Sequence, residues 1–133
     1  MFFDQLLNQT NGPLLERVLS FTAARHKLLA ENIANADTPD YRQKDLSVDA
    51  FNQMLQQRAA ESDSAPPGTV GFDDIDEAIT YPNNGILAHD GNNVAMEQLV
   101  SDQAKNALMH NVIVELLRQQ FQQLQAALKD HVS

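Results

Sequence analysis

Four histidines are the residues of this chain best suited by type to bind a metal ion or to transfer a proton. They are His26, His89, His110 and His131, and no two of them are three or four residues apart. That spacing would place two ligands on one helix face. The chain has no cysteine to complete a ligand set. The sequence therefore predicts no metal site, and His26 and His110 are interpreted as polar positions that set the register of a helical seam.

An acidic cluster at residues 73–77 (DDIDE) raises the possibility of calcium binding. It lacks the alternating carboxylates, the central glycine and the terminal glutamate of an EF-hand loop, and we interpret it as solvated. His89 beside Asp90 does not make a catalytic triad, and no nucleophile elbow, phosphate-binding glycine loop or His-Glu-x-x-His motif occurs. The sequence thus predicts no enzyme, no catalytic residue, no cofactor and no small-molecule substrate.

The charge of the chain is concentrated in its middle. The 133 residues carry a formal net charge of -9. No lysine or arginine lies between Arg58 and Lys105, and this interval holds enough acidic residues to account for the whole imbalance. Because the chain has no basic stripe, nucleic acid binding and attachment to a membrane surface are not expected. The first seven residues lack a basic region and Asp4 interrupts their apolar run, so we expect no cleaved signal peptide.

The N-terminal helix is expected over residues 13–36. Pro13 is a favourable first helical residue. Apolar and small residues recur at alternating spacings of three and four, in a seam of Leu15, Leu19, Thr22, His26, Leu29, Ile33 and Ala36. Pro39 disfavours helix at Thr38, so the helix is expected to end near Ala36 or Asp37. Asn32 and Asn35 are weak helix formers, and an interaction beyond helix propensity must hold them there.

The middle of the chain is expected to be less regular. Residues 37–60 are predicted to form a turn and a short helix that Ser47 caps and that reaches about Arg58. Residues 61–93 are rich in proline, glycine, asparagine and acidic residues, which indicates an irregular acidic loop region with room for one small β-hairpin. Segments of this kind carry function or become ordered on a partner.

The longest predicted element is a C-terminal helix over residues 94–130, with Asn93 as its cap. Its seam consists of Met96, Val100, Gln103, Ala107, His110, Val114, Leu117, Phe121, Leu124 and Leu128. This helix exceeds the first by about 20 Å at the helical rise per residue. One end of its seam is therefore expected to meet either the apolar segment Phe2–Leu7 or a neighbouring subunit.

These elements predict a mainly α fold in one domain, residues 1–133. Long N- and C-terminal helices form an antiparallel coiled-coil-like pair, accompanied by a short middle helix and the irregular acidic region. The seam contains polar residues such as Thr22, His26 and Gln103, and no third long helix is expected to cover it. Contacts between chains would supply the missing burial, and a head-to-tail contact of this kind produces a filament.

Two sequence blocks resemble the flagellar basal-body rod, hook and hook-associated proteins. Residues 29–42 (LAENIANADTPDYR) are similar to that family's N-terminal signature, which runs close to Ala-Asn-Asn-Ile-Ala-Asn-Ala-Asn-Thr-Pro-Gly-Tyr. Residues 90–97 (DGNNVAME) are similar to its Asp-Gly-Asn-x-Val-Asp-x-Glu. The short chain looks most like the proximal rod proteins. Asp40 stands where the family usually has glycine, and it can adopt a positive φ at modest cost. Ala95 stands where the family often has aspartate.

The resemblance implies a structural subunit of the proximal rod, part of the motor's drive shaft. Its implied partners are copies of itself or homologous subunits, other flagellar rod subunits, the FliE-type basal-body adaptor and the flagellar export gate. It would lie in the periplasm-spanning rod of the basal body after type III export without signal cleavage. The residues expected at subunit contacts are Leu29, Asn32, Ile33, Asn35, Ala36, Thr38, Pro39, Tyr41, Gly91, Asn92, Val94, Val114, Leu117, Phe121 and Leu124.

One alternative stays open from the residues alone. A cytosolic helical-hairpin adaptor or export chaperone would also use long amphipathic helices, in order to bind a client helix in a groove. The Thr38-Pro39 turn has no role in such a protein. A chaperone is expected to be a stable folded dimer, whereas a rod subunit is expected to be loosely folded at its termini before assembly.

Overall fold

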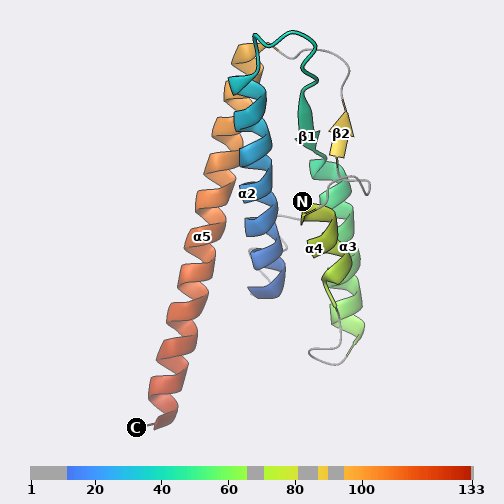
Figure 1. Cartoon of the computed structure of the whole chain (residues 1–133). Coiled ribbons are helices and arrows are strands. Elements are labelled where there is room, and N and C mark those ends of the chain that lie inside the picture. The colour runs from blue at the N-terminus through green and yellow to red at the C-terminus, as the bar shows by residue number, and fades with distance from the viewer. Residues whose placement is uncertain (1–11, 66–70, 81–86, 90–94, 133) are drawn as a thin grey trace.

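The computed structural model describes residues 12–65, 71–80, 87–89 and 95–132, and this part of the chain is mainly α. In chain order the elements are α2 (Gly12–Ala34), β1 (Lys44–Leu46), α3 (Val48–Ser64), α4 (Asp73–Thr80), β2 (Leu87–His89) and α5 (Met96–Val132) (Figure 1). The predicted mainly α class is therefore confirmed. The expected Phe2–Leu7 contact, the Asn93 cap and the sites Gly91, Asn92 and Val94 lie outside the described residues.

Helix α2 is the central element of the arrangement. It contacts α5 on one side, and β1 and α4 on the other (Figure 1). The chain rises through α2 and descends through α5, so the two helices run in opposite directions. The side chains agree with this direction, because Thr22 contacts Asn106 and His110, while Gly12 lies beside Gln120 further down α5.

The core joins α2 to the layer of α3 and α4. The rings of Phe21 on α2 and Phe51 on α3 stack with their centroids 4.0 Å apart and their planes 6° apart. Around this pair lies one cluster of buried side chains from five elements: Leu14, Leu15, Val18, Leu46, Leu55, Ile75, Ala78, Ile79 and Ile113. A single core therefore holds the described elements together, with α2 as its common wall.

The two short strands pair across a long sequence separation. β1 and β2 are antiparallel, with Lys44 opposite His89 and Leu46 opposite Leu87. A small hairpin within residues 61–93 was expected from the sequence. In the structure β2 pairs instead with β1, which lies outside that region, after the turn that follows α2. Three-residue strands carry too little alternation for their pairing to be predicted from the sequence.

Helix α4 corrects the expectation that residues 61–93 are irregular. Three aspartates in its first turn, Asp73, Asp74 and Asp76, suit the positive end of the helix dipole. Ile75, Ala78 and Ile79 are buried along its inner side. The acidic cluster that suggested calcium is thus the start of an amphipathic helix, whose polar face is acidic and whose apolar face enters the core.

Two arginines attach α4 to the rest of the protein. Arg17 donates to Asp76 at 3.0 Å and lies over the Phe72 ring, 4.7 Å from its centroid. Arg58 donates to Asp74, and to Glu61 at 2.9 Å. The hydrogen bond with Glu61, followed by that with Asp74, raises the pKa of Arg58 against the opposing effect of burial. Helix α3 continues to Ser64, beyond its predicted end at about Arg58, and Glu61, which pairs with Arg58, lies in this added turn.

Only part of the seam predicted for α5 faces α2 or the core, because His110 contacts Thr22 and Leu117 packs against the core. Leu99, Asn106 and Ile113 are buried against the rest of the fold, whereas the predicted positions Met96, Val100 and Val114 are 45%, 50% and 44% exposed. The three buried positions and the series Val100, Ala107 and Val114 each recur every seven residues, offset by one residue, which turns a helix by about 100°. Helix α5 therefore carries two stripes with the same period. Periodicity alone cannot identify the stripe that meets α2.

Some polar positions of the predicted seams also differ from their expected places. Thr22 is buried and His110 half-buried at the contact between α2 and α5. His26 is exposed beside this contact, so its predicted place inside the seam is wrong. Phe21 and Asn32 face the core where the prediction favoured the neighbouring positions Thr22 and Ile33.

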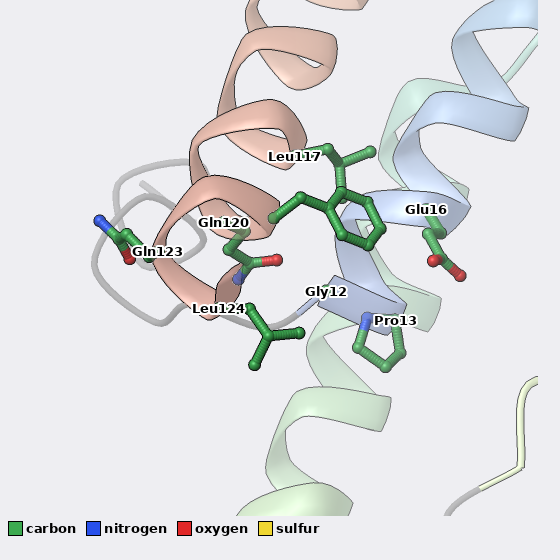
Figure 2. A pocket seen from close by; sticks show the side chains of 8 residues that line it. Gly12, Pro13, Glu16, Leu117, Gln120, Gln123 and Leu124 are labelled. Carbon is green, nitrogen blue, oxygen red and sulfur yellow. The ribbon is translucent and has the colours of Figure 1, made fainter. Parts of the chain in front are cut away.

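The C-terminal end of α5 extends beyond α2. Helix α5 has 37 residues and α2 has 23, which at the helical rise leaves an overhang of about 20 Å. Phe121, Leu124 and Leu128 on this overhang are 59%, 57% and 57% exposed. Figure 2 shows Leu117 and Leu124 beside Gly12 and Pro13, at the start of α2. The expected apolar overhang is present in the structure.

We predict that Phe51→Ala lowers the free energy of unfolding by about 3–5 kcal/mol, because it removes a buried ring and leaves a cavity against Phe21. Urea denaturation followed by circular dichroism measures the change. Leu108→Ala on the exposed face of α5 is the control and should stay within about 0.5 kcal/mol of the wild type. Equal effects of the two substitutions would show that the aromatic pair does not anchor the core.

Candidate functional site

The segment that joins α2 to β1 is a series of short turns. After Ala34, the backbone N–H of Asn35 donates to Glu31 O at 3.0 Å, that of Thr38 to Asn35 O at 3.0 Å, and that of Tyr41 to Thr38 O at 3.3 Å. Helix α2 ends at Ala34, two residues before the predicted end, because the bonds to Ala36 and Thr38 span three residues and tighten the last turn. Asp40 has a φ of 63°, which confirms the positive φ expected there.

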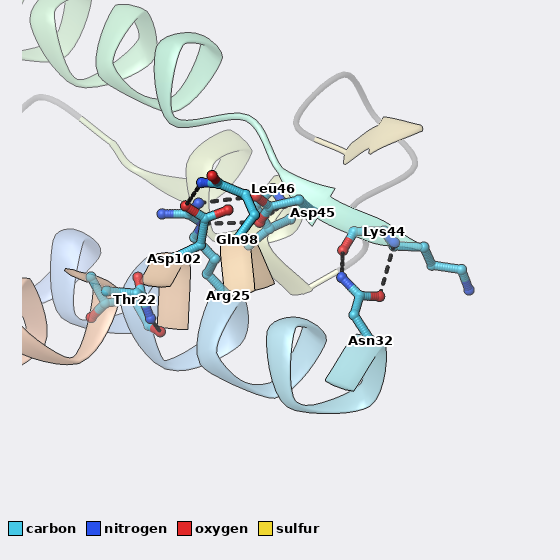
Figure 3. A network of polar contacts seen from close by, with 9 residues as sticks. Thr22, Arg25, Asn32, Lys44, Asp45, Leu46, Gln98 and Asp102 are labelled. Carbon is cyan, nitrogen blue, oxygen red and sulfur yellow. Dashed lines mark hydrogen bonds and ion pairs between the residues drawn. The ribbon is translucent and has the colours of Figure 1, made fainter. Parts of the chain in front are cut away.

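Asn32 fastens this joint from inside the fold. Its side chain is 2% exposed, and its amide group pairs with the backbone of Lys44 in both directions. Nδ2 donates to Lys44 O at 2.6 Å, and Lys44 N donates to Oδ1 at 3.0 Å (Figure 3). The Tyr41 hydroxyl donates to the same Oδ1 at 3.4 Å. Asn32 therefore acts toward β1 as a neighbouring strand would, and this contact holds a weak helix former inside α2.

Asn35 and Thr38 make local contacts on the surface. Asn35 Nδ2 donates to Glu31 O at 2.9 Å, which gives that carbonyl a second donor at the end of the helix. Thr38 Oγ1 donates to Asn35 Oδ1 at 3.2 Å. Asn32 and Asn35 thus differ in role, because one connects two elements in the core and the other closes the end of its own helix.

An ion pair reinforces the position of β1. Arg25 Nε and a terminal guanidinium nitrogen donate to the two carboxylate oxygens of Asp45 at 2.9 and 3.0 Å (Figure 3). Asp45 Oδ1 also accepts from the backbone N–H of Leu46 at 2.8 Å. A bidentate pair of this geometry fixes orientation as well as distance. Arg25 was not among the predicted site residues, because a separation of twenty residues from Asp45 leaves no recognisable pattern in the sequence.

The structure brings together part of the predicted N-terminal site. Leu29 and Asn32 are buried, Ile33, Asn35, Ala36 and Tyr41 are half-buried, and Thr38 and Pro39 are exposed. Residues Ala36 to Arg42 line a shallow surface hollow of about 450 Å³. Residues 29–41 form one continuous joint, whose inner side chains position β1 and whose outer side chains lie on the surface.

The predicted C-terminal residues form a separate surface. Val114, Phe121 and Leu124 are exposed and Leu117 is half-buried. Leu117, Phe121 and Leu124 line a hollow of about 460 Å³ with Gly12, Pro13, Glu16, Gln120 and Gln123 (Figure 2). Its apolar side chains can pack against another apolar surface, and Glu16 is the one ionisable side chain among the described residues of its lining.

A third hollow, of about 350 Å³, lies between α2 and α5 and is lined by Ala23, His26, Asn106, Ala107, His110 and Asn111. Its floor is polar. Asn106 Nδ2 donates to Thr22 O at 2.8 Å, and Thr22 Oγ1 donates to Leu19 O at 2.9 Å. Thr22 Oγ1 and His110 Nδ1 also form a hydrogen bond, with the two atoms 2.7 Å apart. Asn106 is a site residue that the sequence analysis missed, although it belongs to the buried stripe of Leu99 and Ile113.

Within the part of the chain that the structure describes, no group of three or more histidine and acidic side chains is arranged to hold a metal ion. None of the described helices is both long and apolar enough to cross a membrane.

We predict that Asn32→Leu lowers the free energy of unfolding by about 1–3 kcal/mol, because it leaves the backbone N–H and C=O of Lys44 without their Asn32 partners. Urea denaturation measures the loss, and faster hydrogen exchange at the Lys44 amide locates it. Asn35→Ala loses an exposed bond at the C-terminal end of α2 and should cost about 1 kcal/mol or less. If Asn35→Ala lowered the free energy of unfolding as much as Asn32→Leu, the hydrogen bonds between Asn32 and the Lys44 backbone would not be what holds β1.

No protein-family model matches the chain, and no solved structure matches it. Among curated proteins it is 29% identical over 102 residues to flagellar basal body rod protein FlgB of Aquifex aeolicus, covering 77% of this chain and 79% of that one. It is 29% identical to the Bacillus subtilis FlgB over 118 residues, with 86% and 89% coverage. For the Yersinia enterocolitica FlgB the identity is 26%, with 93% and 98% coverage. The resemblance drawn from the two sequence blocks is thus confirmed: the chain resembles the flagellar basal body rod proteins over most of its length and is most like FlgB.

Proposed function

We propose that this chain is a structural subunit of the bacterial flagellar basal body rod, where it assembles with other rod proteins into the drive shaft of the motor. The matched proteins all carry the name of a rod component and none the name of an enzyme. The function is mechanical, because packed helices transmit torque through the contacts between subunits. No observation favours a cytosolic adaptor or export chaperone.

The observation that carries the proposal is the uncovered apolar surface of α5. Met96, Val100, Val114, Phe121, Leu124 and Leu128 are large apolar side chains that stand about half exposed or more along one helix. Soluble monomers rarely display a continuous apolar stripe of this length. Burial gains about 25 cal/mol for each Å² removed from water, so contacts with other subunits are the natural way to stabilise this helix.

The finer arrangement is part of the same proposal. Helices α2 and α5 pack as an antiparallel coiled-coil-like pair on the inner side of the rod, and the joint at residues 29–41 with the acidic middle lies at an outer or intersubunit surface. The buried ends of the joint support this division, because Asn32 and Leu29 serve the fold while Thr38 and Pro39 are free to contact a neighbour. The subunit is one domain.

The proposed partners follow from the rod. They are copies of this chain or homologous rod subunits in a helical assembly, the FliE-type basal-body adaptor and the flagellar export gate. The proposed location is the periplasm-spanning rod, which the chain reaches by type III export without a cleaved signal peptide. Neither nucleic acid nor a small-molecule substrate belongs to this function.

In the organism that encodes this chain, we expect deletion of its gene to abolish rods and swimming, and the wild-type gene to restore both. Phe121→Asp should restore neither, because a charge on the overhang opposes burial, while the variant is still exported. Electron microscopy of basal bodies and a swimming assay measure the result. Leu108→Asp, exposed on the other side of α5, is the matched control and should restore rods. Intact rods in the deletion strain would overturn the proposal.

In the purified chain, we expect amides of α5 beyond Gln120 to exchange hydrogen rapidly, while α3 and the N-terminal half of α5 are protected. The overhang touches the described fold only at the start of α2, and an isolated helix of about a dozen residues is marginal in water. Hydrogen exchange measured by mass spectrometry, alone and with rod partners, should show protection of this end on mixing. Strong protection in the isolated chain would favour a self-sufficient adaptor.

A further inference from the structure

We infer that the overhang of α5, residues 119–128, docks into the groove between α2 and α5 of a second copy of this chain. The inference rests on the proposed rod function and deepens it, because it assigns the two surfaces of one contact between identical subunits.

The receiving surface is the hollow of about 350 Å³ lined by Ala23 and His26 from α2 and by Ala107, His110 and Asn111 from α5, with Asn106 as its floor. Val100 and Val114 lie two helical turns to either side of Ala107, so they continue the same face of α5 beyond the hollow. Both valines are about half exposed. Two alanines at the centre allow the backbone of a third helix to approach closely.

The inserting surface is the end of the same helix. Residues 119–128 (QQFQQLQAAL) contain no charged residue, although the chain as a whole has a net charge of -9. Phe121, Leu124 and Leu128 recur at spacings of three and four and therefore lie on one face, with more than half of each side chain exposed. Glutamine amides flank this face.

Charge and hydrogen bonding favour a second copy as the occupant. None of the side chains that line the groove is an aspartate, glutamate, lysine or arginine, so a helix with a charged face would lose hydration there without gaining a partner. The uncharged overhang avoids that cost. Its glutamines both donate and accept, which suits His26 and Asn111 at the rim. Every copy of the chain supplies this helix at the same concentration as the groove.

The size of the contact indicates how it works. A buried phenylalanine covers about 150–250 Å², so one aromatic and two leucine side chains make an interface well below the 1,200–2,000 Å² of a stable complex. A single contact is therefore weak. The inserting and receiving surfaces differ, so each subunit offers one of each and the contact repeats without closing. Repetition, supported by neighbouring subunits, stabilises the array.

Cysteine cross-linking tests the contact without interference from native disulfides, because the chain has no native cysteine. Ala107→Cys marks the groove and Leu124→Cys marks the overhang. Within one chain the two positions are about 25 Å apart along α5, beyond the reach of a disulfide. A disulfide between them therefore joins two subunits. Leu108→Cys, adjacent in sequence but directed away from the groove, replaces Ala107→Cys as the matched control.

We expect mild oxidation of a mixture of the two single-cysteine chains, at high concentration and in basal bodies from cells that express both, to give the Ala107→Cys to Leu124→Cys heterodimer. The Leu108→Cys control should not give it, and adding Phe121→Asp to the Leu124→Cys chain should abolish it. A chain with both cysteines should form a ladder of oligomers. A heterodimer yield no greater than that of the Leu108→Cys control would overturn the inference.

Two other products would also overturn it. A predominant Leu124→Cys homodimer would show an isologous contact between overhangs. An intramolecular disulfide in a chain with Leu6→Cys and Leu124→Cys would show that the overhang is covered by its own N-terminal segment. Swimming of the single-cysteine strains separates the two proposals, because a motile strain without the heterodimer refutes this contact and leaves the rod function intact.

Discussion

The structure depends on the burial of α2 from two sides. One side of this helix receives Phe51, β1 and α4, and the other receives α5. If α5 were absent, the residues around Thr22 would be exposed to water. If α3 and α4 were absent, Phe21 would be exposed. The two layers are therefore stabilised through one helix, and a change at either side of α2 affects the packing of the other. The joint after Ala34 is coupled to this core because Asn32 and Leu29 are buried at the end of the same helix.

Polar contacts fix where the elements meet along α2. Apolar packing by itself tolerates sliding by a helical turn, whereas a hydrogen bond between buried groups does not. The hydrogen bond from Asn106 to Thr22 O sets the register of α5 against α2. The hydrogen bonds between Asn32 and the Lys44 backbone set the register of β1, and the ion pair of Arg25 with Asp45 holds β1 at the same position. Each buried polar group would be costly without its partner, so alternative registers are disfavoured more strongly than their apolar contacts alone would require.

Local chemistry made several elements predictable. Ser47 accepts from Ala50 N at the start of α3, as its place before an apolar run indicated, and Asp40 has the positive φ that its turn requires. The positions of both long helices followed from period and from proline. The predictions that were wrong concern contacts between residues far apart in the sequence. Helix α4 forms because Ile75 reaches a core built by distant residues, and β1 pairs with a strand more than forty positions away. The stripe of α5 that meets α2 was predicted only in part, because Leu99, Asn106 and Ile113 share their period with Val100, Ala107 and Val114.

The two stripes of α5 explain how a subunit can be both folded and adhesive. The stripe that faces α2 includes Asn106, with His110 beside it, so part of the internal contact is made by hydrogen bonds whose register is specific and whose net gain is small. The large apolar side chains of Val100, Val114, Phe121 and Leu124 stay outside. With this apolar stripe facing outward, we expect the end of α5 to be weakly ordered in the isolated subunit and to become fully buried only on assembly.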